Sequence, residues 1–255
     1  MGKQLEIIYE DDELVFVNKP SGMLSIPDRY ATDLPNVYNL LQRKFGDIYP
    51  VHRLDRETSG LICFAKNEVI HKSMNQLFQK RDVGKYYYVL VNGVMNHDEG
   101  TIDKPIAQNK MDSSKMIIAK RGKESTTLYK VLERFKDVTV VEAQIKTGRT
   151  HQIRVHFEAL GYPLLVDKVY GKHTEFLVSS LKGRKFKLAK GTVEKPLLNR
   201  TSLHAHRLVF THPTSQKEIE IVAPLPRDIA AVVKQLRKWG NNCLLYTSPS
   251  PRDRG

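Results

Sequence analysis

The sequence predicts an α+β fold with a mixed, largely antiparallel sheet and flanking helices. Strand-like segments fall into four blocks separated by single helix-like segments, whereas a doubly wound fold alternates helices with every strand. Within one block, Val141, Ala143 and Ile145 alternate with polar residues, which is typical of a strand with one buried face. Neither GxxxxGK[ST] nor GxGxxG occurs. We therefore expect no ATP or NAD cofactor.

The first half of the chain shows three strand-like and two helix-like segments. A β-favouring run stops at Pro20, and the next apolar segment has helical spacing and ends at Gly46. The run GLICFAK is apolar throughout, which predicts a strand covered on both faces. In order, the expected elements are a strand over 14–17, a helix over 37–45, a strand over 60–66, a helix over 67–84 and a strand over 85–92.

The second half begins with a polar, Lys-rich stretch over 99–124. A long hairpin or flap is one interpretation, and a solvated loop is the expected one. A later helix is predicted with Thr150 as N-cap, an apolar stripe of Ile153, Phe157 and Leu160, and Gly161 at its end. The remaining expectations are antiparallel strands over 126–135 and 138–146, a basic loop over 171–200, a strand pair over 202–226 and a helix over 227–240.

Composition favours a polyanionic partner. The 255 residues hold 41 Lys and Arg against 28 Asp and Glu, a formal net charge of +13. A basic protein with no such partner is the alternative. The only two cysteines, Cys63 and Cys243, exclude a disulfide framework. With no export signal and no membrane-length apolar run, we expect a cytoplasmic protein without membrane contact.

Basic residues gather at the predicted start of the later helix. Arg149, His151 and Arg154 flank free backbone N–H groups there, which suits a phosphate or a carboxylate. An ordinary solvated helix start explains them equally well. His204 and His206 lie two residues apart, but no Asp, Glu or Cys completes a metal shell by spacing. We therefore expect no metal.

Asp55 is an unusual acid in this basic chain. It lies between Arg53 and Arg56 in a loop that enters the buried strand over 60–66. Neighbouring cations favour the ionised carboxylate. Such a carboxylate can act as a nucleophile, or it can simply pair with arginine to fix the loop. The spacing alone leaves both roles open.

The segment VHRLDRETSGLICFAK resembles the signature of the RluA-type pseudouridine synthases. That signature reads HRLD, two variable residues, TSG, an apolar stretch and AK. Further segments resemble the family in order: NKPSGMLSIP, KYYYVLVNG, TGRTHQIRVHFEALGYPLLVDKVYG and LHAHRLVFTHP. The likeness covers roughly residues 5 to 230. The matching residues are His52, Arg53, Leu54, Asp55, Thr58, Ser59, Gly60, Ala65 and Lys66.

The resemblance implies a pseudouridine synthase fold with a central active-site cleft, and a cofactor-free enzyme that isomerises uridine in RNA. Asp55 matches the catalytic aspartate, and Tyr87 matches the tyrosine beside the target base. Arg154 matches the residue that pairs with the catalytic carboxylate, and Arg53 an arginine involved in base extrusion. Lys19, in the family's opening segment, is assigned with Arg53, Arg149 and His151 to RNA binding.

The remaining expectations concern organisation and substrate. One catalytic domain is expected over 1–240, without the separate RNA-binding module that many relatives carry, and we expect a monomer. The ending CLLYTSPSPRDRG matches nothing in the family, so 241–255 is interpreted as read-through or as a disordered tail. The expected partner is ribosomal or transfer RNA. The alternative is a non-catalytic RNA-binding protein with the same fold.

Overall fold

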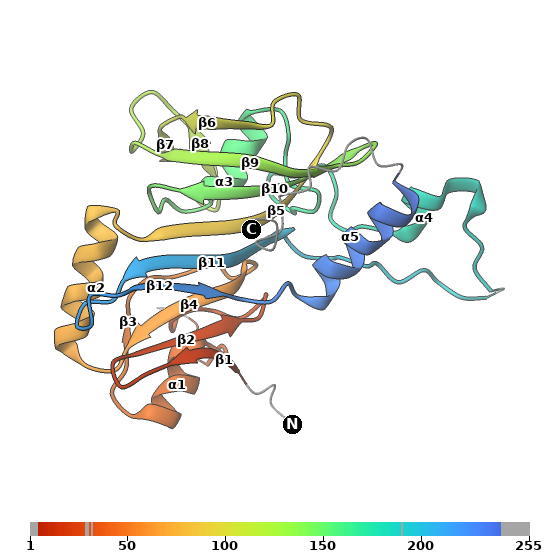
Figure 1. The fold of residues 1–255 in the computed structure, drawn as a ribbon. Helices are drawn as coiled ribbons and strands as arrows, with labels where there is room; N and C mark the ends of the chain where they lie inside the picture. Colours follow the sequence, from red (N-terminus) through yellow and green to blue (C-terminus); the bar gives the residue numbers. More distant parts are fainter. Residues whose placement is uncertain (1–4, 29–30, 32, 190, 241–255) are drawn as a thin grey trace, which may run out of the picture.

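One large sheet organises the chain (Figure 1). A computed structural model describes residues 5–28, 31, 33–189 and 191–240. Eight strands follow one another across the sheet in the order β1-β2-β4-β11-β5-β10-β9-β6, while β12 pairs with β11 and β3 with β4. All of these pairs are antiparallel except β4 with β11. The predicted fold class is confirmed.

Strand bounds follow the sequence patterns closely. The alternation predicted for β10 is observed, with Val141, Ala143 and Ile145 buried and Glu142 and Gln144 half-buried. The strands are β1 Glu6–Glu10, β2 Leu14–Lys19, β3 Tyr49–Pro50, β4 Ser59–Ala65, β5 Gly84–Asn92, β6 Glu99–Asp103, β7 Ile106–Gln108, β8 Met116–Ile118, β9 Thr126–Arg134, β10 Val138–Ile145, β11 Leu203–Thr211 and β12 Glu218–Val222.

Helix ends are set by local chemistry. The Asn36 side chain accepts a hydrogen bond from the backbone N–H of Asn39 at the start of α1, and Gly46 ends this helix with a φ of 75°. Val69 in α2 is exposed, and Ile70 and Met74 make the buried face. The helices are α1 Val37–Phe45, α2 Glu68–Lys80, α3 Gln152–Ala159, α4 Val178–Lys182, a 3-10 turn Gly183–Lys185 and α5 Arg227–Trp239.

Strand β4 has a core on each face, as its unbroken apolar sequence predicted. Ile62 and Phe64 pack in the cluster that includes α1 and α3. Leu61 and Cys63 pack on the opposite side in the cluster that includes α2. A third cluster lies between α5 and the strands β5 and β10. Because both faces hold β4 in place, the loop that precedes it starts from a rigid element.

Two polar segments have more structure than expected. The stretch 99–124 was expected to be a solvated loop, but β6 pairs with β9, and β7 and β8 form a two-stranded hairpin. The stretch 171–200 was expected to be a loop, yet α4 packs against α5. Periodicity missed both because these elements bury few side chains. The interpretation of 241–255, including Cys243, falls outside the described residues.

None of the helices in the described part of the chain is long and apolar enough to cross a membrane.

Candidate active site

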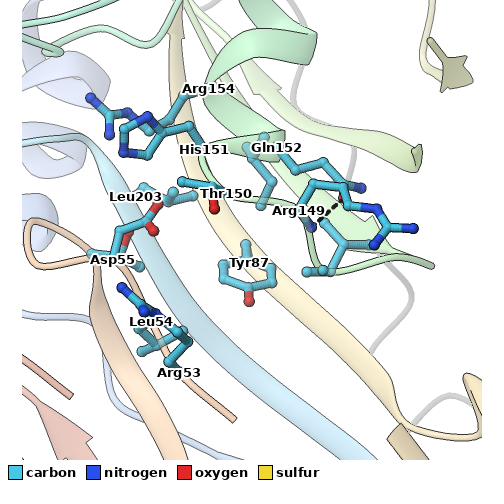
Figure 2. A pocket seen from close by; sticks show the side chains of 14 residues that line it. Arg53, Leu54, Asp55, Tyr87, Arg149, Thr150, His151, Gln152, Arg154 and Leu203 are labelled. Atoms are coloured by element: carbon cyan, nitrogen blue, oxygen red, sulfur yellow. Dashed lines mark hydrogen bonds between the residues drawn. The ribbon is translucent and has the colours of Figure 1, made fainter. Parts of the chain in front are cut away.

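A cavity of about 120 Å³ joins the predicted site residues from distant parts of the chain (Figure 2). Asp55 enters from the loop before β4, Tyr87 from β5, and Leu203 from β11. The segment between β10 and α3, with the first turn of α3, forms the opposite wall. The residues that line the cavity are Arg53, Leu54, Asp55, Thr58, Tyr87, Ile145, Gly148, Arg149, Thr150, His151, Gln152, Ile153, Arg154 and Leu203.

Backbone hydrogen bonds fix the Asp55 loop. The Thr58 N–H donates to the Asp55 carbonyl over 3.1 Å, which closes a turn around the acid. Ser25 holds Leu54, the residue before Asp55. The Ser25 hydroxyl donates to the Leu54 carbonyl at 2.9 Å and accepts from the Leu54 N–H at 3.0 Å. The Asp55 side chain is half-buried and points into the cavity. The sequence prediction that Asp55 lies in a loop feeding a buried strand is confirmed.

Lys19 does not contact this cavity. It is fully buried at the end of β2, and its Nζ donates to the carbonyls of Pro20, Met23 and Arg56 at 3.1, 2.7 and 3.1 Å. Burial lowers the pKa of Lys19 to about 7, against the opposing effect of the Asp55 charge. In this structure the Lys19 side chain ties β2 to the Asp55 loop, and its RNA contact stays a prediction.

Tyr87 forms the floor of the cavity. Its strand neighbours are Ala143 and Ala205, two small residues that leave space around the ring. The side chain is nearly buried, with 9% exposed. Burial, and secondarily the charge of Asp55, raises the pKa of the phenol well above its usual value. Tyr87 therefore stays neutral and presents an aromatic surface next to the carboxylate.

Arg154 has a different ion-pair partner from the one predicted. Its Nε and one terminal nitrogen donate to the two carboxylate oxygens of Asp167 at 2.6 and 2.8 Å. Among the described residues, no ion pair within 4.0 Å joins Arg154 to Asp55. The Asp55 charge still raises the pKa of Arg154, after the larger effects of burial, which lowers it, and of Asp167. Arg154 thus lies near Asp55 but is held by Asp167.

The Asp167 carboxylate is fully buried and stays ionised. Burial raises its pKa, but the hydrogen bonds and charge of Arg154 outweigh burial and hold the pKa below its usual value. Two backbone N–H groups, of Val169 and Tyr170, add hydrogen bonds at 2.9 and 3.1 Å. Asp167 received no role from the sequence, and its position after the apolar run PLLV is the one sequence signal that marks it.

The start of α3 differs from the prediction. Thr150 does not cap the helix, because His151 takes the N-cap position in a left-handed conformation with a φ of 56°. Gln152 organises the approach instead. Its Oε1 accepts from the Thr147 hydroxyl at 2.7 Å and from the Arg149 N–H at 3.0 Å. No sequence pattern marked Gln152, because its role depends on how the loop before it folds.

Arg53 and Arg149 line the cavity on different sides. Arg53 is exposed at the rim, and the Arg149 Nε donates to the Glu124 carbonyl at 3.1 Å. In Figure 2 the Asp55 carboxylate lies between the side chains of Arg53 and His151. Asp55 is the one carboxylate among the cavity-lining residues, which therefore offer a single anionic group in a cationic rim with an aromatic floor. Such a site suits an anionic substrate whose ring lies on Tyr87.

His204 is a structural histidine. Its Nδ1 lies 2.9 Å from the Ser59 hydroxyl, and burial lowers its pKa to about 3. His206 Nδ1 bonds to the Ala223 carbonyl at 2.9 Å. Over the described ranges, no group of three or more His, Cys, Asp or Glu side chains is placed to hold a metal ion.

Sequence comparison identifies the family. Residues 13–159 match the family model described as RNA pseudouridylate synthase. A Bacillus subtilis protein named uncharacterized RNA pseudouridine synthase YlyB is 38% identical over 92% of this chain and 74% of its own length. The Pasteurella multocida dual-specificity RNA pseudouridine synthase RluA is 35% identical over 86% and 93%. The ribosomal large subunit pseudouridine synthase D of Zymomonas mobilis is 33% identical over 91% and 73%.

Solved structures agree with this result. Human RNA pseudouridylate synthase domain containing 1 is 28% identical, with a TM-score of 0.70, and the match covers 96% of this chain and 91% of that chain. Human RNA pseudouridylate synthase domain containing 4 is 25% identical with the same TM-score, covering 91% and 93%.

Proposed function

Because the chain belongs to the RNA pseudouridylate synthase family, we propose that it isomerises specific uridines of structured RNA with Asp55 as the catalytic carboxylate. One observation carries the assignment. Asp55 lies in the HRLD motif and is the single carboxylate among the residues that line the cavity, next to the ring of Tyr87. A lone carboxylate suits a reaction that needs one positioned anionic group.

The reaction is an isomerisation and needs no oxidant. The bond between the ribose C1′ and N1 of uracil breaks, the detached base turns, and C1′ bonds to C5. The C5 proton is lost and N1 gains a proton, so atoms and electrons balance. The site must therefore keep the free base in place. We assign Tyr87 to the face of the base, and Arg154, held by Asp167, to the polar wall opposite.

A uridine stacked in a helix cannot reach this cavity, so the base is extruded. Extrusion costs roughly a few kcal/mol, which stacking on Tyr87 and phosphate contacts offset. We assign the phosphate contacts to Arg53, Arg149 and His151, which line the cavity. The formal charge of +13 supports this assignment, because it favours association with RNA in general.

Ribosomal RNA is the substrate class that the comparisons support first. Several relatives, including that of Zymomonas mobilis, are named ribosomal large subunit pseudouridine synthases. We therefore expect an unpaired uridine in a ribosomal RNA loop to be the target, where extrusion is least costly. A pseudouridine map of total RNA, with and without the gene, tests this choice, and disappearance of a site in transfer RNA alone would contradict it.

The variant Asp55→Asn tests the catalytic assignment. It keeps the shape of the side chain and removes the charge, so the rate should fall by at least about 1,000-fold while RNA affinity changes less than about threefold. Single-turnover conversion of a cellular RNA fraction and a filter-binding titration measure the two quantities.

Two results would contradict the proposal in different ways. A wild-type protein that binds RNA but modifies no uridine would support the non-catalytic alternative. Release of free uracil would identify a glycosylase, because an isomerase returns the base to the same ribose.

A further inference from the structure

Tyr170 connects two separate parts of the site. It follows α3 in the chain, and its hydroxyl lies between the β7–β8 hairpin and the N-terminus of α3. The oxygen accepts from the Met116 backbone N–H over 2.8 Å, and it lies 2.8 Å from His151 Nδ1. Met116 is the first residue of β8. One hydroxyl group therefore contacts both the hairpin and a residue that lines the Asp55 cavity.

The Tyr170 ring is also fixed on its other sides. The Arg154 guanidinium lies 4.9 Å from the ring centroid, and the His151 ring meets it edge-on with centroids 5.5 Å apart. The backbone N–H of Tyr170 donates to Asp167, the same carboxylate that holds Arg154. Tyr170 thus contacts His151 and Arg154 and is hydrogen-bonded to Asp167, the counter-ion of Arg154.

The hydrogen-bond pattern assigns the proton on His151. The Tyr170 oxygen already accepts from Met116, and its own proton has no other acceptor among the described residues. The hydroxyl therefore donates to Nδ1, which leaves the ring N–H of His151 on Nε2. Burial and the Arg154 charge lower the pKa of His151, while the charges of Asp55 and Asp167 oppose them. A neutral imidazole with Nε2–H agrees with the hydrogen-bond pattern and with the lowered pKa of His151.

The hairpin matters because it covers a second cavity. This cavity, of about 590 Å³, lies between the hairpin and residues 148–150 and shares Gly148, Arg149 and Thr150 with the Asp55 cavity. Its base is closed by reciprocal backbone hydrogen bonds between Ile106 and Lys123 at 2.9 and 2.8 Å. Its lining mixes apolar and polar residues and includes three cationic side chains, Arg121, Lys123 and Arg149, but no carboxylate. An RNA strand leaving the Asp55 cavity would enter this space.

We propose that Tyr170 is a positioning residue that couples the β7–β8 hairpin to the His151 and Arg154 wall of the Asp55 cavity, so that RNA held under the hairpin and the reacting geometry depend on each other. The coupling to RNA rests on the proposed function, but the contacts of Tyr170 in the free protein do not. Its hydroxyl holds Met116 and sets the tautomer of His151, while its ring supports Arg154.

The variant Tyr170→Phe removes the hydroxyl and keeps the ring. Loss of a hydrogen bond of about 1 kcal/mol should speed hydrogen exchange of the Met116 amide about fivefold. Loss of the donor to Nδ1 should raise the pKa of His151 by roughly half a pH unit or more, since that bond stabilises the neutral ring. Both are measured by NMR on the free protein. Tyr162→Phe is the matched control, because the Tyr162 hydroxyl bonds to none of the described residues, and it should change neither quantity.

An unchanged Met116 amide or an unchanged His151 pKa in Tyr170→Phe overturns the coupling. Neither readout uses RNA modification, so an inactive wild-type protein would count against the proposed function alone. A double-mutant cycle measured on kcat gives a second test. Tyr170→Phe and His151→Asn remove the same bond from opposite ends, and asparagine tolerates the left-handed backbone. Their losses in kcat should be strongly non-additive, and additive losses would contradict the proposal.

Discussion

At the scale of single residues, the Asp55 loop is held by groups that do not line the Asp55 cavity. Ser25 clamps Leu54 through two hydrogen bonds, and Lys19 donates to the carbonyl of Arg56. Gly22 adds a third tie, since its N–H donates to the same Arg56 carbonyl at 2.8 Å. These contacts join the segment after β2 to the loop before β4. The position of the Asp55 carboxylate therefore depends on residues that the chemistry never touches.

Lys19→Met separates a positioning role for Lys19 from RNA binding. Methionine fills a similar buried volume but donates no hydrogen bond, so the Asp55 loop loses its tie to β2. We expect single-turnover conversion to slow by about 10- to 100-fold, as for small misplacements of reacting groups, with RNA affinity unchanged. Lys72→Met on the exposed face of α2 is the control and should alter neither. A loss of affinity without a loss of rate would support Lys19 as an RNA contact.

At the scale of elements, the parallel contact between β4 and β11 sets the place of the site. His204 pairs with Ser59 and Ala205 with Gly60, immediately after the Asp55 loop. Ala205 also faces Tyr87 on the next strand. This short pairing therefore brings the loop of Asp55 and the ring of Tyr87 to the same part of the sheet. Gly60 permits the approach, because a side-chain Cβ there would lie 2.1 Å from the Ala205 carbonyl oxygen.

Gly60→Ala should be severely destabilising. Its φ of 117° is unfavourable for alanine, and the added methyl group would collide with backbone that has no freedom to move. We expect a loss of at least about 3 kcal/mol in the free energy of unfolding, measured by urea denaturation.

Gly22→Ala is the matched control for this change. Gly22 also has a positive φ, of 84°, but nothing lies within 4 Å of the added Cβ. Its cost should stay near 1 kcal/mol, which is the backbone term alone. Equal losses for the two variants would show that the close approach of β4 to β11 is unimportant.

At the scale of the whole molecule, the cationic residues around the two adjoining cavities indicate how RNA lies on the protein. The Asp55 cavity has Arg53 at its rim, and the cavity beneath the hairpin adds Arg121 and Lys123, which are exposed. Lys120 precedes them and is exposed as well. We expect this hairpin base to bind the phosphates beside the target uridine.

Replacing Lys120, Arg121 and Lys123 together by alanine tests this surface. RNA binding should weaken, and the slope of log affinity against log salt should flatten by about 0.7 to 0.9 for each phosphate that the variant no longer neutralises. A triple variant of exposed lysines on α2 and α5, Lys72, Lys80 and Lys234, controls for net charge. If the two triple variants show the same RNA affinity and the same salt slope, the hairpin is an ordinary solvated surface.

The sequence by itself determined the longer strands and helices and the location of the acid. Apolar continuity in β4 and alternation in β10 predicted burial correctly, because burial repeats with the local period of the backbone. The HRLD segment then located Asp55 at the entrance to a buried strand. Short-range patterns are sufficient for such statements, since each depends on neighbours within one element.

Only the tertiary structure decided which side chains meet. Arg154 pairs with Asp167 thirteen residues away, and Lys19 reaches a carbonyl 37 residues away, so neither partner follows from spacing. His151, not Thr150, takes the N-cap position in a left-handed conformation, and Gln152 holds the preceding loop through the Arg149 N–H. The hairpin strands bury little, so periodicity gave no sign of them. These features depend on contacts between segments that are distant in the chain. A local sequence pattern does not indicate which distant segments come into contact.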